Sequence, residues 1–74
     1  MTDQELTALK KKFGKNLKKI RESKGMSLLD VSYNCTIDES HISKIEQGMF
    51  NITLSTIAEL AKGLEIPPSR LMEY

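Results

Sequence analysis

The sequence predicts an all-α fold, a compact arrangement of five helices, and three observations support this prediction. Apolar residues recur every three or four positions along most of the 74 residues. A residue that can cap a helix precedes four of the five segments, and glycine or proline follows three of them. Strand signals are absent, because the chain has no hairpin turn pair and no sustained alternation of β-branched residues. We therefore expect residues 1–74 to form a single domain with one small core.

The first helix is expected to begin at Thr2 or Asp3, where Thr2 and Glu5 match a capping box. Its apolar residues form a single stripe: Leu6, Leu9, Phe13, Leu17 and Ile20. Gly14 weakens the helix interior by up to about 1 kcal/mol, so we expect fraying of the first turns. Gly25 suits the left-handed position that ends a helix.

The second and third helices are expected over residues 28–35 and 39–47. Ser27 is a good N-cap for the second helix, and Asp38 is a good N-cap for the third, which Gly48 ends. Only three residues separate the two helices, so they are held in contact at a steep angle. This spacing is typical of a helix-turn-helix, which we place at about residues 27–48, and it excludes a long antiparallel hairpin.

A fourth helix follows the loop 49–52, with Thr53 as its cap. The residues expected on its inner face are Leu54, Ile57, Leu60, Ala61 and Leu64. Pro67 or Pro68 then opens a last short helix that runs through Leu71 and Met72.

The charge is unevenly distributed, although the net charge is only +1. Eight of the eleven basic residues lie between Lys10 and Lys24, where Glu22 is the only acid. Such a basic segment is usually a solvated helix face, but next to a helix-turn-helix it is also typical of nucleic-acid binding. We expect no membrane span and no signal peptide, and hence a cytoplasmic location.

Cysteine and histidine are too few for a metal site, since the chain has one of each, Cys35 and His41. We expect no metal and no cofactor. Cys35 occupies a core position and is expected to be a small buried hydrophobe. No nucleophile, base and orienting group are spaced for catalysis, so we do not expect an enzyme.

The run from His41 to Gly48 reads HISKIEQG, and with it the stretch from about Phe13 to Met72 resembles the phage Cro/CI repressor and XRE-type transcriptional regulators. Their motif has apolar residues at five places, here Val31, Cys35, Ile37, Ile42 and Ile45. Ser32 supplies the small residue that lets the two helices approach, and the run from His41 to Gly48 is similar to the family signature I-S-K-I-E-x-G. The resemblance implies a lambda-repressor-like domain that binds double-stranded DNA.

The third helix is the expected reading helix. Ile42 and Ile45 hold it on the core, so the opposite face points outward. An α-helix of this kind fits the major groove with its N-terminal residues at base edges. Lysine donates to guanine, glutamate accepts from cytosine, and serine does either. The expected base-reading residues are Glu39, Ser40, Ser43 and Lys44.

Phosphate contacts are expected from the start of the second helix, the edge of the reading helix and the beginning of the fourth helix. The residues concerned are Ser27, His41, Asn51, Thr53 and Thr56. The resemblance also implies a buried ion pair between Arg21 and Glu46; the alternative is an exposed pair of little energetic weight.

Two positions depart from the family pattern. Leu28 replaces the usual glutamine, so a phosphate contact is lost or is left to the backbone amide. Thr36 replaces the usual glycine, so either the turn follows a different path or it holds about 1–2 kcal/mol of strain. Asp38 and Glu39 also place negative charge where phosphates should pass, and we expect helix capping to occupy Asp38.

Members of the family read two-fold sites as dimers, with half-sites about 34 Å apart. We therefore expect a homodimer on a palindromic operator. The candidates for the interface are two apolar sets, Met49, Phe50 and Ile52 in the loop, and Ile66, Leu71, Met72 and Tyr74 at the end. We favour the second set, because the last residues are too few to be fully buried in one protomer. Restriction–modification controllers, antitoxins and small repressors all have this size. The alternative function is a protein-interaction module of the antitoxin type, which would present Glu39 and Lys44 to a protein partner.

Overall fold

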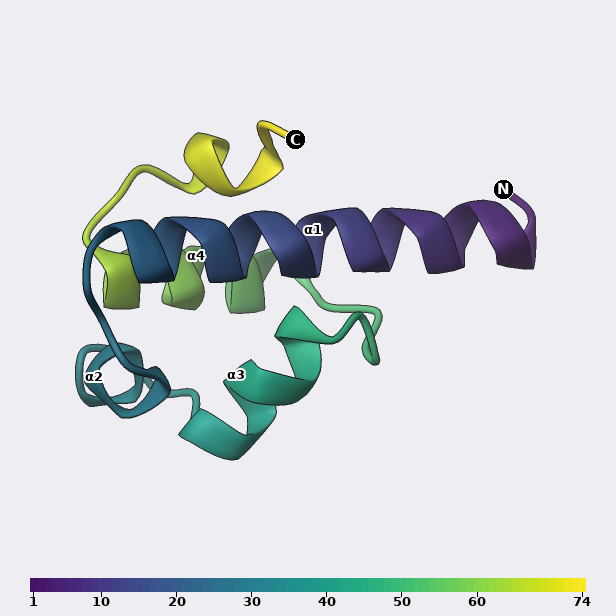
Figure 1. Cartoon of the computed structure of the whole chain (residues 1–74). Coiled ribbons are helices and arrows are strands. Elements are labelled where there is room, and N and C mark those ends of the chain that lie inside the picture. Colours follow the sequence, from purple (N-terminus) through teal and green to yellow (C-terminus); the bar gives the residue numbers. More distant parts are fainter.

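The computed structural model describes all 74 residues and contains four α-helices followed by one 3-10 helix. These elements are α1 (Asp3–Ser23), α2 (Leu28–Tyr33), α3 (Glu39–Glu46), α4 (Leu54–Leu64) and η1 (Pro68–Met72). α3 and η1 pack on α1, α2 packs on both α3 and α4, and η1 also packs on α4. Figure 1 shows α3 on one side of α1 and η1 on the other. The all-α prediction is confirmed.

The predicted fifth helix is a single 3-10 segment. Pro67 and Pro68 at its start have no backbone N–H, and the Arg70 N–H donates to Pro67 O three residues back, at 3.0 Å. The predicted ends of α2 and α3 also shift slightly, because α2 ends at Tyr33 and α3 at Glu46. None of the helices combines the length and the apolar character that a bilayer crossing requires.

Ten apolar side chains from all five elements form the core. They are Phe13, Leu17, Ile20, Val31, Ile42, Ile45, Leu60, Ala61, Leu64 and Leu71. Half-buried residues pack around them, among them Leu28 and Cys35. Leu28 therefore places its side chain against the core, where it cannot make the phosphate contact of the usual glutamine.

Three of the four predicted helix caps are made by side chains. Thr2 with Glu5 and Ser27 with Asp30 both form complete capping boxes, and the Thr53 hydroxyl accepts from the Thr56 N–H. The backbone N–H of each box's first residue donates to the carboxylate, which holds the pKa of Glu5 and Asp30 below their usual values. Asp38 is different, because its side chain makes no cap hydrogen bond. The expectation that the Asp38 carboxylate caps α3 is wrong, although Asp38 is the N-cap residue.

Gly14 lies where α1 meets the last turn of α3. A Cβ atom built on it would collide with the backbone carbonyl oxygens of Ile45, at 2.6 Å, and of Glu46. The sequence indicated only a weak point in α1, yet the helix is continuous from Asp3 to Ser23. The missing side chain allows the two helix backbones to touch.

The predicted ion pair between Arg21 and Glu46 is present beside this contact. Arg21 Nε donates to Glu46 Oε2 at 2.7 Å and Arg21 Nη2 donates to Oε1 at 3.0 Å. The two side chains are only 11% and 6% exposed. The bonds to Glu46 raise the pKa of Arg21, and Arg21 Nη1 also donates to Met26 O at 2.9 Å, at the turn before α2. One arginine therefore connects α1, α3 and the start of the helix-turn-helix.

Gly14→Ala should destabilise the protein by about 2–4 kcal/mol, because the added methyl group meets backbone carbonyls that cannot move aside. Helix propensity alone would instead raise the free energy of unfolding by about 1 kcal/mol. Urea unfolding followed by circular dichroism measures the change. The control is Lys15→Ala, an exposed neighbour on α1, expected to change stability by less than about 0.5 kcal/mol. A more stable Gly14→Ala variant would contradict the close contact.

Glu46→Gln should cost about 3 kcal/mol of stability, because the Arg21 cation is left without a charged partner in a mostly buried position. Glu73→Gln is the matched control. It removes the exposed pair of Arg70 with Glu73, whose atoms are 3.5 Å apart, and should cost less than about 1 kcal/mol. Equal losses of unfolding free energy in the two variants would show that burial of the first pair carries no weight.

Candidate nucleic-acid interface

α3 lies on the side of α1 away from η1 (Figure 1), and its exposed side chains are polar. Ile42 and Ile45 are 0% and 2% exposed and fix the inner face of the helix on the core. Glu39, Ser40 and Lys44 are exposed on α3, and Ser43 is half-buried. The structure thus brings the four expected base-reading residues onto one helix, with three of them fully accessible.

Gln47 joins this face, although the sequence reasoning did not single it out. It is the exposed C-cap residue of α3, and its Nε2 donates to Ser43 Oγ at 3.2 Å. A spacing of four residues from Ser43 was the available signal, since residues four apart on a helix are neighbours. A side-chain amide has the donor and the acceptor that pair with adenine, and Gln47 lies next to Ser43 at the end of α3.

The beginning of α3 carries two free carboxylates. Asp38 lacks a cap bond and Glu39 forms no ion pair, and both are exposed. Lys44, also unpaired, is the only lysine or arginine of α3. An approaching phosphate would be repelled here, whereas the amino group of a base would find acceptors.

His41 and Phe50 stack at the edge of the reading face. Their ring centroids are 4.8 Å apart and the planes are tilted by 53°. Both residues are exposed, and together with Asp38, Ser40 and Lys44 they line a shallow hollow. The expected edge position of His41 agrees with this geometry, and Phe50 adds an apolar surface next to it.

The N-terminus of α2 is a poorer anion site than the sequence indicated. Ser27 Oγ accepts from the Asp30 N–H at 3.0 Å, and the Asp30 carboxylate accepts from the Ser27 N–H at 2.8 Å. Because Asp30 already neutralises this end of the helix, a phosphate at Ser27 would meet a negative charge.

The N-terminus of α4 offers hydroxyl groups and has no acidic residue in its first turn. Thr53 Oγ1 lies 2.8 Å from Ser55 Oγ and 3.2 Å from Thr56 Oγ1, and Asn51 is exposed just before them. Ser55 belongs to this cluster and was missed, although its position within the first turn of a capped helix was visible. Hydroxyl donors and free N–H groups together suit a phosphate oxygen.

The lysines of α1 are divided between its two sides. Lys12, Lys15 and Lys19 line shallow hollows with Tyr74 and Glu73, on the side of η1. Lys11 instead lies against Gly48, at the end of α3. Three of the eight clustered basic residues therefore face away from the reading helix.

The turn between α2 and α3 follows a different path from the one that a glycine would require. Glu65 is the only non-glycine residue with a positive φ, so Thr36 has an ordinary backbone conformation. The strain alternative for Thr36 is wrong, and a glycine there would bring no relief. Instead, the Thr36 N–H and Oγ1 both donate to Glu59 Oε1 on α4, at 3.0 and 3.1 Å.

The expected dimer residues have unequal exposure. Leu71 is fully buried in the core, where η1 returns onto α1 and α4, so its place in an interface is wrong. Ile66 is half-buried, and Met72 and Tyr74 are 50% and 46% exposed. Leu54 was expected on the inner face of α4, yet it is 84% exposed as the first residue of that helix.

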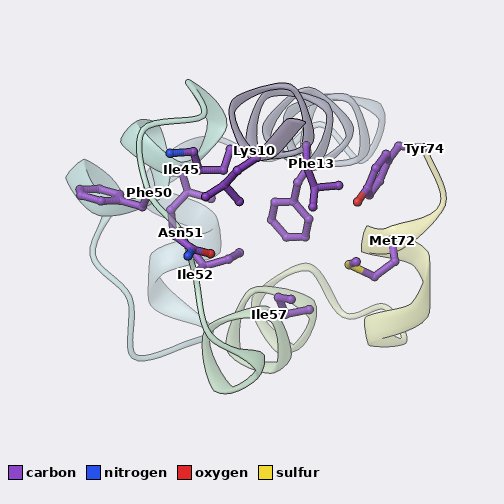
Figure 2. Close-up of a pocket in the computed structure, with 11 residues that line it drawn as sticks. Lys10, Phe13, Ile45, Phe50, Asn51, Ile52, Ile57, Met72 and Tyr74 are labelled. Carbon is purple, nitrogen blue, oxygen red and sulfur yellow. The ribbon is translucent and has the colours of Figure 1, made fainter. Parts of the chain in front are cut away.

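An apolar groove of about 180 Å³ lies between the N-terminal half of α1, the α3–α4 loop and the C-terminus. Figure 2 shows Phe13, Ile57 and Met72 around this groove, with Tyr74 beside them. Asn16 holds the C-terminal wall in place, since its Nδ2 donates to Arg70 O and Leu71 O at 3.1 and 3.0 Å. One part of the exposed apolar surface is thus next to the C-terminus; Leu29, Tyr33 and Met49 are exposed elsewhere.

The helix-turn-helix family model matches residues 17–71. Control protein C.BamHI of Bacillus amyloliquefaciens is 33% identical over 63 residues, which cover 84% of this chain and 78% of that protein. The restriction–modification controller protein C.AhdI of Aeromonas hydrophila has 34% identity and a TM-score of 0.82, over 88% of this chain and 94% of that one. The controller C.Esp1396I, solved as a tetramer with its natural 35 base-pair operator, has 35% identity and a TM-score of 0.80, over 88% and 86%. The chain belongs to the Cro/CI-like, XRE-type helix-turn-helix family of DNA-binding transcriptional regulators.

Proposed function

We propose that this protein is a transcriptional regulator of the restriction–modification controller class, which binds a palindromic operator in double-stranded DNA as a homodimer. The observation that carries the proposal is the polar face of α3, held outward by Ile42 and Ile45 on a backbone that superposes on controllers with a TM-score of up to 0.82. A rigid helix with exposed side chains at its N-terminal end has the dimensions of the major groove.

Base reading falls to Glu39, Ser40, Ser43 and Lys44, with Gln47 as an addition. Lys44 donates to guanine O6 or N7, and Glu39 accepts from cytosine N4. The negative charge at the start of α3 supports this role for Glu39, because the charge weakens binding wherever no base amino group is present to donate to the carboxylate. Discrimination between sequences is thereby favoured over general affinity.

Phosphate contacts fall mainly to the start of α4. Thr53 and Thr56 with Asn51 remain the proposed contacts there, and Ser55 joins them, because this helix end has hydroxyls and no carboxylate. His41 reaches a phosphate from the edge of α3. Ser27 contributes at most its own hydroxyl, since Asp30 occupies the helix end beside it.

The proposed dimer interface consists of Ile66, Met72 and Tyr74, with Leu54 and the groove beside Ile57 as further contact surface. Burying these exposed apolar side chains against a second copy removes them from water, which is the driving force for association. The two-fold axis places two α3 helices in successive major grooves, about 34 Å apart.

Selection of bound fragments from a random-sequence duplex library, at moderate salt, tests the proposed function. We expect enrichment of a palindromic site whose two halves lie one helical turn apart. Recovery of no sequence over the background would overturn the proposal. Binding of a protein partner through the α3 face in that case would support the antitoxin-type alternative.

Lys44→Ala should cost about 1–3 kcal/mol of binding free energy on the selected site and should relax the preference at one base position per half-site. Fluorescence anisotropy with single-base variants of the site provides the measurement. Lys15→Ala is the matched control, because it removes the same charge from the face of α1 beside η1. A uniform loss for Lys44→Ala on all duplexes would instead make Lys44 a phosphate contact.

A further inference from the structure

The turn that leads into the reading helix has few hydrogen bonds of its own. Residues 36–38 donate no hydrogen bond to another backbone group, and the bond from Cys35 N to Ser32 O is long, at 3.5 Å. Cys35 Sγ makes only weak contacts with Val31 O and Ile37 O, at 3.4 and 3.7 Å. The path of the turn is therefore set by the packing of Cys35 and Ile37 on the core and by a polar group outside the turn.

Glu59 on α4 is that group. Its Oε1 accepts both the backbone N–H and the hydroxyl of Thr36, so one carboxylate oxygen fixes the backbone and the side chain of one residue. Asn34 makes the neighbouring connection, from Nδ2 to Gly63 O at 3.3 Å, but it lies at the end of α2. Glu59 is thus the polar anchor nearest to the beginning of α3.

The two ends of α3 are held in different ways. Its C-terminal end is clamped on α1 by the contact at Gly14 and by the pair of Arg21 with Glu46. Its N-terminal end, which carries Glu39 and Ser40, follows directly from the anchored turn. Residues 39–41 have no buried side chain, so a change of the turn would shift this first turn of α3 while Ile42 and Ile45 hold the rest of the helix.

We propose that Glu59 is a positioning residue, whose carboxylate sets the direction in which α3 presents its base-reading end. This inference rests on the proposed function for its consequence in DNA binding. Glu59 itself touches no DNA in this arrangement; it acts through Thr36. In the related motifs a glycine with a positive φ shapes this turn. Here Glu59 shapes the turn instead, through its hydrogen bonds to Thr36.

The charge state of Glu59 suits this role. The two bonds from Thr36 hold the pKa of Glu59 below its usual value, and Lys62, three residues further on α4, acts in the same direction. The carboxylate is therefore ionised at neutral pH, and hydrogen bonds to an ionised acceptor are stronger than those to a neutral one.

The test compares Glu59→Ala and Glu59→Gln with Glu22→Ala, a control that removes an exposed carboxylate on α1 that accepts no side-chain hydrogen bond. Dissociation constants are measured by anisotropy for two duplexes, the fragment selected by the wild-type protein and a scrambled duplex of equal length. The temperature is kept where circular dichroism shows every variant folded. Under these conditions a loss of stability alone leaves both constants unchanged.

Glu59→Ala should raise the dissociation constant for the selected site about tenfold, because the reading end of α3 is no longer held in register. The constant for scrambled DNA should change by less than about twofold, since non-specific binding depends on charge. Glu59→Gln, which keeps an acceptor oxygen, should restore part of the loss, and Glu22→Ala should cause none. Removing a negative charge alone would strengthen binding, so the expected sign is opposite to a general electrostatic effect.

Residual dipolar couplings of the free protein give a second, independent measurement that does not require an operator. In Glu59→Ala we expect the amide vectors of residues 39–41, the first turn of α3, to reorient relative to those of α4, with no such change in Glu22→Ala. Unchanged couplings, or unchanged affinity for the selected site, would overturn the positioning role. Failure of the wild-type protein to select any site would count against the proposed function alone, because the couplings still decide the role of Glu59.

Discussion

The backbone contact between α1 and α3 at Gly14 is the constraint on which the rest of the structure depends. Because no Cβ separates the helices, the last turn of α3 rests directly on α1, and Arg21 can reach Glu46 beside it. The same arginine binds Met26 O, so the entry to the helix-turn-helix is tied to this point. Every side chain on the outer face of α3 is presented relative to this contact.

Most of the fold was predictable, because helical spacing and caps are local properties. The core positions Leu17, Ile42 and Ile45 follow from the apolar stripe and the motif, and the Ser27 cap follows from residue type. The ends of the chain were less predictable. Leu71 is buried and Leu54 exposed, because burial at an element's edge depends on where a distant element packs, which spacing alone does not reveal.

The candidate site was predictable in its reading helix and less so in its surroundings. Ser40 and Lys44 are exposed where the motif indicated. The bond of Glu59 to Thr36 joins residues 23 positions apart, and no pattern in the sequence links them. The free carboxylate of Asp38 was also hidden, because the residue type favours capping and only the geometry shows that the bond is not made.

The outward face of α3 is separate from the packing that holds the helix. Glu39, Ser40 and Lys44 have no part in the core, so their replacement leaves the contact at Gly14 and the buried isoleucines untouched. Under the proposed function, such an arrangement lets recognition diverge during evolution while the scaffold is retained. The controllers with 34% and 35% identity keep the same backbone, with TM-scores of 0.82 and 0.80. Descendants of this protein can therefore acquire a new DNA target through a few surface substitutions, without loss of stability.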